Sequence, residues 1–121
     1  MTIEEIVISY LADENIEGIG DHAYAEAPED EEVYVLVERS GGSVANFIRE
    51  HRIYTEVCVP RNEMIGQNKI LALRLHEAVI EAMLRISDTT PVYRCHLNAD
   101  YEAADPNRKQ YRYQALWQIT I

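Results

Sequence analysis

The sequence has few cysteines, no long apolar run and no basic residue in its first quarter, and each absence excludes a class of protein. Two cysteines among 121 residues, Cys58 and Cys95, are too few for a disulfide scaffold. No apolar run approaches the roughly 20 residues that a membrane-spanning helix needs. The start also lacks the charged and apolar pattern of a secretory signal. We therefore expect a protein of a reducing cytoplasm that contacts no membrane.

Motifs that would indicate catalysis or metal binding are missing as well. Gly41-Gly42 is a lone pair, typical of a turn and not of a glycine-rich phosphate loop. The sequence has no close cysteine pair of the kind that structural zinc sites use. Cys95 and His96 are adjacent on an expected strand, so they point to opposite faces. We therefore expect no enzyme activity, no metal site and no cofactor.

Lysine and arginine are absent from residues 1–32, which hold eleven acids, whereas residues 33–121 hold ten acids and all eleven bases. The densest group of acids is Glu26, Glu29, Asp30, Glu31 and Glu32. Such a cluster repels phosphates and anionic lipids, so we expect no specific binding of nucleic acid. The segment has two interpretations. It is either a solvated loop that aids solubility, or an acidic surface that functions by meeting a basic partner or by facing passing DNA.

Hydrophobic periodicity predicts two helices. Thr2 and Glu5 form a capping-box pattern before a helix over residues 3–14. The second helix, over 68–86, has one broad apolar arc that includes Leu71. It also has a second apolar stripe at Leu73, Ile80 and Leu84. An outer helix of a monomer needs one apolar face, so this stripe is buried either beneath a loop or against another subunit.

Five strands are predicted at about 22–27, 33–39, 51–59, 92–103 and 109–121. Ser40-Gly41-Gly42-Ser43 is expected to end the second strand, and residues 44–50 are ambiguous. The last strand alternates strictly between apolar and polar residues, which indicates one buried face. Short connections favour a single α+β domain over residues 1–121, with a mostly antiparallel sheet of about four to five strands and two helices packed on it.

In its order of elements the chain resembles the small tail-terminator and tail-to-head joining proteins of long-tailed bacteriophages. The matching features are the short first helix, the strands Val33–Val37 and Ile53–Val59, the single long helix and a closing strand Tyr-Arg-Tyr-Gln-Ala-Leu-Trp-Gln-Ile-Thr-Ile. The resemblance implies a ring, commonly of six identical subunits, that caps the tail tube protein and meets the head-completion or connector protein, while DNA passes through. It implies assembly in the host cytoplasm, a final place at the head–tail junction of the virion, and no catalysis.

Under this hypothesis Leu73, Ile80 and Leu84 are candidates for a subunit contact, and residues 26–32 for an acidic lumen or a docking surface. Two other classes remain open. An acidic protein-binding module or DNA mimic that inhibits a DNA-handling enzyme needs its acids spread in rows over a surface. A small α+β enzyme or ligand-binding domain needs a pocket with converging polar groups.

Overall fold

The computed structural model describes residues 1–30, 32–45, 48–61, 67–103 and 109–121 of the chain. Its elements in chain order are α1 (Ile3–Glu14), β1 (Ala23–Tyr24), β2 (Tyr34–Ala45), β3 (Ile48–Pro60), α2 (Gln67–Leu84), the 3-10 turn η1 (Ile86–Asp88), β4 (Arg94–Ala103) and β5 (Gln110–Thr120). The predicted α+β class is confirmed, because the five strands form one mostly antiparallel sheet that carries two helices.

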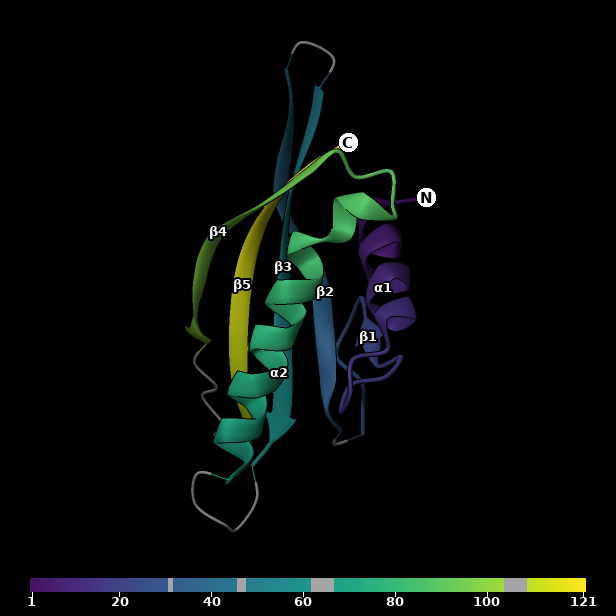
Figure 1. Ribbon diagram of the computed structural model, residues 1–121. Helices are drawn as coiled ribbons and strands as arrows, with labels where there is room; N and C mark the ends of the chain where they lie inside the picture. The colour runs from purple at the N-terminus through teal and green to yellow at the C-terminus, as the bar shows by residue number, and fades with distance from the viewer. Residues whose placement is uncertain (31, 46–47, 62–66, 104–108) are drawn as a thin grey trace.

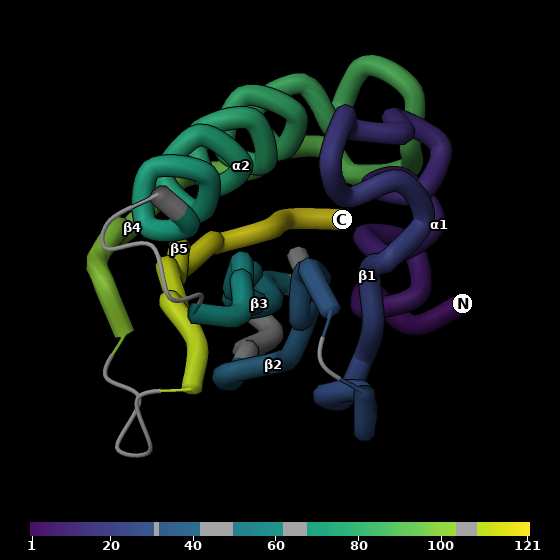
Figure 2. Tube along the Cα trace, turned by 90° about the horizontal axis from the view of Figure 1, so that it is seen from below, coloured from purple at the N-terminus to yellow at the C-terminus, as the bar shows by residue number. Residues whose placement is uncertain are grey.

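The strands lie in the order β1-β2-β3-β5-β4. Only the short β1–β2 pair is parallel, and β2–β3, β3–β5 and β5–β4 are antiparallel. Both helices cover the same face of the sheet, with α2 across β3 and β5 and α1 beside β1 and β2 (Figures 1 and 2). The opposite face, called the open face below, carries no helix formed by the described residues.

The core lies between the helices and the sheet. Alternate residues of the strands point into it, and the apolar sides of both helices close it from the other side. Its fully buried strand residues include Val35, Val37, Ile53, Val57, Ala115, Trp117 and Ile119. The buried Thr55 hydroxyl accepts a hydrogen bond from Nε1 of Trp117 at 2.9 Å, which satisfies the ring N–H inside the core.

Local signals define the first helix. The Thr2 hydroxyl oxygen accepts a hydrogen bond from the backbone N–H of Glu5 at 3.2 Å, as a capping residue does. The helix ends at Asn15, whose φ of 49° is left-handed, and asparagine tolerates that conformation better than most residues. The bounds of α1 are therefore those that the sequence predicts.

The hairpin of β2 and β3 corrects two expectations. β2 continues through Ser40-Gly41-Gly42-Ser43, and residues 44–50, where they are described, belong to both arms of the hairpin. Gly41 and Gly42 stay in register with Arg52 and His51 of β3, and a bulge between Arg39 and Gly41 absorbs the extra residue. Because β3 begins to pair with β5 only at Glu50, the hairpin extends beyond the rest of the sheet (Figure 1).

Two other elements are shorter than the sequence predicts. The expected strand 22–27 is reduced to Ala23–Tyr24, because only these two residues come into register with β2. The long helix ends at Leu84 and continues as η1. Leu71, expected in the buried arc, is 38% exposed, while Ala72 and His76 are buried. The rest of the predicted arc is mostly buried, with Leu75, Val79, Ala82, Met83 and Ile86 all at 5% exposure or less. The face of α2 that meets the sheet is therefore the predicted arc, shifted slightly away from Leu71 toward Ala72 and His76.

Candidate subunit interface

One side of α2 and the neighbouring edge strand β4 form the first candidate surface. Lys69 Nζ lies 3.9 Å from Glu102 Oε2, and His76 Nε2 lies 2.5 Å from Asp100 Oδ1. These two contacts fix which side of α2 faces β4. β4 is the last strand of the sheet and pairs only with β5 among the described residues, so its outer edge has no strand partner among them.

The apolar stripe of α2 lies on this same side. Leu73 and Ile80 follow Lys69 and His76 by four residues, and Leu84 follows Ile80 by four, so all three lie on one side of the helix. Leu73 and Ile80 are half-buried against the core of their own chain. Leu84 is 55% exposed. The structure therefore separates the three candidates: two already pack internally, and Leu84 remains accessible to a neighbour.

β4 adds more exposed apolar surface. Leu97, which pairs with Trp117 on the helix side of the sheet, is 38% exposed, and Tyr101, which pairs with Gln114 on the open face, is 45% exposed. Tyr93, which precedes the strand, is 74% exposed. A ten-residue edge strand with such side chains is a template for association. Sequence reasoning missed this edge, because nothing in the local pattern of residues 92–103 distinguishes an outer strand from an inner one.

The link between α2 and β4 contains a buried histidine. His76 is 3% exposed, and its ring lies 5.8 Å from the ring of Tyr113. Its Nε2 contacts Asp100, and its Nδ1 has no hydrogen-bond partner among the described residues. The pair joins the edge strand to the helix and so supports the position of β4.

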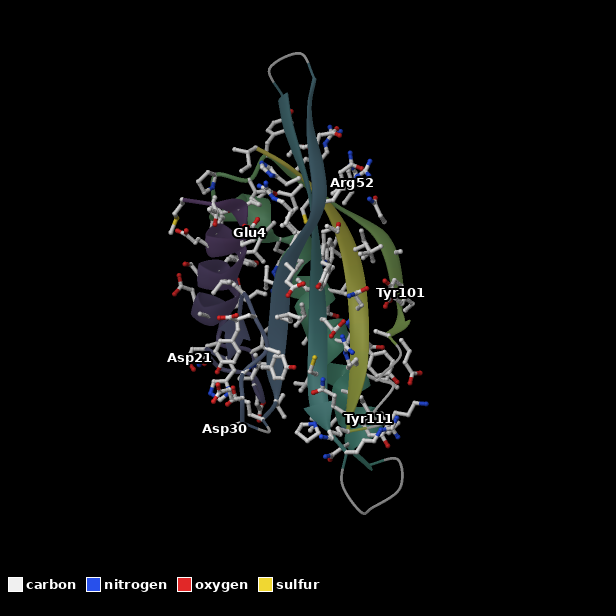
Figure 3. The ribbon with its side chains drawn as sticks, turned by 180° about the vertical axis from the view of Figure 1, so that it is seen from behind. Glu4, Asp21, Asp30, Arg52, Tyr101 and Tyr111 are labelled. Atoms are coloured by element: carbon white, nitrogen blue, oxygen red, sulfur yellow. The ribbon has the colours of Figure 1, made fainter. Side chains whose placement is uncertain are left out.

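A buried ionic network lies at the centre of the open face. Glu56 is 1% exposed although no helix covers it. Arg112 Nε donates to its Oε1 at 2.7 Å, and Gln114 Nε2 donates to its Oε2 at 3.0 Å. Around it, Tyr34, Leu36 and Cys58 form a second apolar cluster, against which Tyr24 and Tyr54 pack. The open face thus has a small core of its own (Figure 3).

The two thiols are unsuited to nucleophilic chemistry. Burial is the main cause that raises the pKa of Cys58 to about 12, and burial also raises the pKa of Cys95 to about 12. Both thiols are therefore protonated near neutral pH, and the thiolate is the reactive form. In the described part of the chain, no three His, Cys, Asp or Glu side chains are grouped so that they could hold a metal ion.

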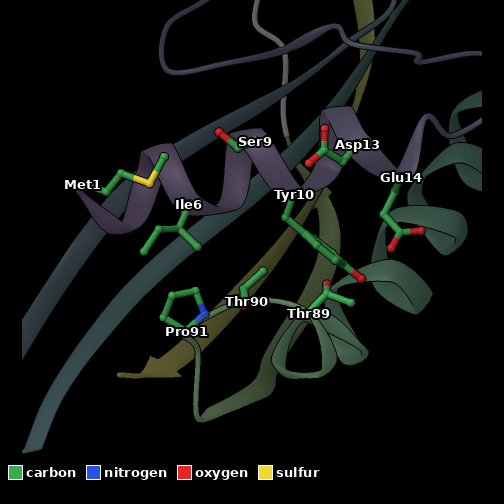
Figure 4. A pocket seen from close by; sticks show the side chains of 9 residues that line it. All are labelled: Met1, Ile6, Ser9, Tyr10, Asp13, Glu14, Thr89, Thr90 and Pro91. Atoms are coloured by element: carbon green, nitrogen blue, oxygen red, sulfur yellow. The ribbon is translucent and has the colours of Figure 1, made fainter.

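A hollow of about 450 Å³ lies between α1 and the segment that follows η1 (Figure 4). It is lined by Met1, Ile6, Ser9, Tyr10, Asp13, Glu14, Thr89, Thr90 and Pro91. The Tyr10 hydroxyl donates to the carbonyl of Ala82 at 2.6 Å, and burial is the main cause that raises its pKa to about 12. Glu14 Oε2 lies 3.8 Å from Arg85 Nη2. These polar contacts attach α1 to the end of α2.

Replacing Tyr10 by phenylalanine should lower the free energy of unfolding by about 1 kcal/mol, because the carbonyl of Ala82 loses a buried donor. Urea denaturation followed by circular dichroism measures the loss. The matched control is Tyr101→Phe, which removes a hydroxyl that bonds Gln114 on the exposed surface. A Tyr10→Phe loss no larger than that of the control would contradict a role for this bond in attaching α1.

The acidic segment lies near β1, along the other edge of the sheet. Glu26, Glu29 and Asp30 are exposed. Glu32 is half-buried, with Oε2 3.6 Å from Nδ1 of His22. Glu31 lies outside the described residues. A second hollow, of about 550 Å³, is formed here by Ile8, Ala23, Tyr24, Ala25, Glu26, Ala27, Pro28 and Glu29.

No protein-family model matches this chain, and no curated protein matches its sequence. In the described residues, neither helix is both long and apolar enough to cross a membrane. The fold and surfaces define an α+β domain with a projecting hairpin, an accessible edge strand beside exposed leucines, and an acidic hollow near the opposite edge.

Proposed function

We propose that this chain is a structural assembly protein that forms a homo-oligomeric ring, of the kind found in tail terminators and head–tail joining proteins at the head-proximal end of a phage tail. The observation that carries this proposal is the accessible β4 edge, with Leu84 and Leu97 exposed on its helix side and Tyr101 exposed on its open-face side. Exposed apolar groups next to unpaired backbone are stabilised when a second chain covers them.

Two further features support assembly over catalysis. Two of the polar groups that line the α1 hollow, Tyr10 and Glu14, are engaged in holding the helices together. The β2–β3 hairpin extends beyond the sheet, where it is placed to reach a neighbouring protein. In the proposed ring the partners are further copies of the chain, the tail tube protein and the head-completion or connector protein. Assembly then takes place in the host cytoplasm and ends at the head–tail junction of the virion.

Light scattering on the purified chain, followed by negative-stain imaging of the same peak, tests the proposal. A ring of about six subunits is expected, because the tail-terminator and joining proteins that the chain resembles commonly form rings of six. A monomer that becomes a ring on tail tubes supports the same conclusion. A stable monomer or dimer that ignores tail tubes contradicts it and favours an acidic protein-binding module.

Replacing Leu84 and Leu97 by aspartate should abolish ring formation while the fold is retained. Leu84 is 55% exposed in the single chain and Leu97 is 38% exposed, so the substitutions cost less stability than they would at a fully buried position, whereas a buried charge in a contact between subunits costs several kcal/mol. Size-exclusion chromatography with light scattering measures the mass. Leu71→Asp is the matched control, because Leu71 is exposed on another side of the same helix. A folded Leu84→Asp, Leu97→Asp variant that still forms rings would exclude this surface as the interface.

A further inference from the structure

We propose that the acidic hollow of one copy binds a basic corner on the next copy, which makes the contact between neighbouring subunits a head-to-tail one. The acidic hollow is the one formed by Ile8 and residues 23–29. The basic corner is Arg52, Tyr93, Arg94 and His96. This inference rests on the proposed self-assembly and adds to it the two surfaces that meet.

The strand register of the sheet brings the residues of the basic corner close together. Arg52 of β3 and His96 of β4 both pair with Gln118 of β5, so they lie on the open face on either side of it. Arg94 pairs with Thr120 in the next row of the same face. Arg52, Arg94 and His96 are all exposed.

The corner has positive charge available for a partner. Neither Arg52 nor Arg94 forms an ion pair with a carboxylate in the part of the chain that the structure describes. Glu50, which pairs with Thr120, lies in the row of Arg94 and offsets part of the charge. Tyr93 is 74% exposed, and the Arg94 guanidinium lies 5.9 Å from the centre of its ring. The corner therefore offers an aromatic ring and two guanidinium groups together.

The acidic hollow has the complementary chemistry. Its wall is made largely of aliphatic and aromatic groups, among them Ile8, Tyr24 and Pro28. Glu26 and Glu29 also line it, and both are exposed and have no cationic partner among the described residues. A tyrosine ring and the stem of an arginine fit such a wall, while the guanidinium reaches the carboxylates. A volume of about 550 Å³ accommodates both side chains.

The two surfaces lie at different places on the chain, which decides the type of assembly. In Figure 3, Arg52 lies toward the hairpin end of the sheet, and Asp21 and Asp30 lie beside β1 toward the other end. A two-fold dimer uses the same self-complementary surface on both copies, whereas two different and distant patches suit a head-to-tail contact, which forms a ring when its rotation closes. The eleven acids of residues 1–32 favour a protein partner over a nucleic acid for the corner, since this charge repels phosphates.

Charge reversal on each surface tests the contact. We expect the corner variant (Arg52→Glu, Arg94→Glu) and the hollow variant (Glu26→Lys, Glu29→Lys) each to weaken self-association about tenfold or more. An equal mixture of the two variants should restore rings, because every contact then joins opposite charges. The matched control is Arg74→Glu, an exposed reversal on the outer side of α2, which should leave the rings intact. Circular dichroism establishes that each variant is folded, and light scattering measures its mass.

The outcomes separate this inference from the proposed function. Rings that persist in both folded single variants would overturn the inference and leave the proposed function standing. Loss of rings in each variant without recovery in the mixture would overturn direct pairing of the two surfaces. A wild-type chain that stays monomeric even with tail tubes would overturn the proposed function and this contact with it.

Discussion

Replacing Arg112 by alanine is expected to lower the free energy of unfolding by about 3 kcal/mol, because the Glu56 carboxylate then stays buried without its cation. Glu56 is 1% exposed, and the Arg112 Nε donor at 2.7 Å is its ionic partner. Gln114 still donates one hydrogen bond at 3.0 Å but brings no charge. Urea denaturation followed by circular dichroism gives the change in free energy from the midpoint and slope.

A second variant separates the cost of the unpaired Glu56 charge from the cost of the packing that the Arg112 side chain contributes. The double variant Glu56→Gln, Arg112→Ala removes the buried charge together with its partner, so it should be more stable than Arg112→Ala alone. Arg74→Ala, which removes an exposed arginine, should change stability by no more than about 0.5 kcal/mol. If the double variant is as unstable as Arg112→Ala, the buried charge is not the cause.

Replacing Trp117 by alanine is expected to destabilise the fold by about 3–5 kcal/mol, the range for truncating a large buried aromatic side chain. The ring is 1% exposed and lies at the centre of the core, and its Nε1 donates to the Thr55 hydroxyl at 2.9 Å. Truncation therefore leaves a cavity and a buried hydroxyl without its donor. Because this is the only tryptophan in the chain, circular dichroism and not intrinsic fluorescence should follow unfolding.

A phenylalanine at position 117 distinguishes the contribution of ring packing from that of the hydrogen bond to Thr55. Trp117→Phe keeps an aromatic ring but loses the N–H donor, so we expect a loss of about 1–2 kcal/mol. A loss as large as that of Trp117→Ala would mean that the ring volume contributes little and that the bond to Thr55 dominates. Such a result would contradict the view of Trp117 as the main packing residue of β5.

Much of the candidate interface lies beyond what local patterns can predict. The stripe Leu73, Ile80 and Leu84 is visible in the sequence as a second apolar side of a helix. Which of the three remains accessible depends on how far β4 covers α2, and the structure leaves only Leu84 more than half exposed. The acids of residues 26–32 are equally visible in the sequence. The hollow that Glu26 and Glu29 line is formed together with Ile8 of α1, a residue distant in the sequence.

The sequence by itself determined the features whose signals are local. Thr2 and Asn15 set the ends of α1 through capping and a left-handed residue, and the alternation of residues 109–121 decided which face of β5 is buried. These signals act within a few residues, where backbone geometry and hydrophobic period are sufficient.

Only the tertiary structure decided the strand order, the exposed edge of β4 and the partner of Glu56. Arg112 lies 56 residues from Glu56 in the chain and meets it because β3 and β5 pair in one register. The same long-range pairing carries β2 through Gly41 and Gly42, whose local preference is for a turn. Hydrogen bonds between distant strands outweigh such local preferences, and for that reason the surfaces proposed for assembly appear only in the folded chain.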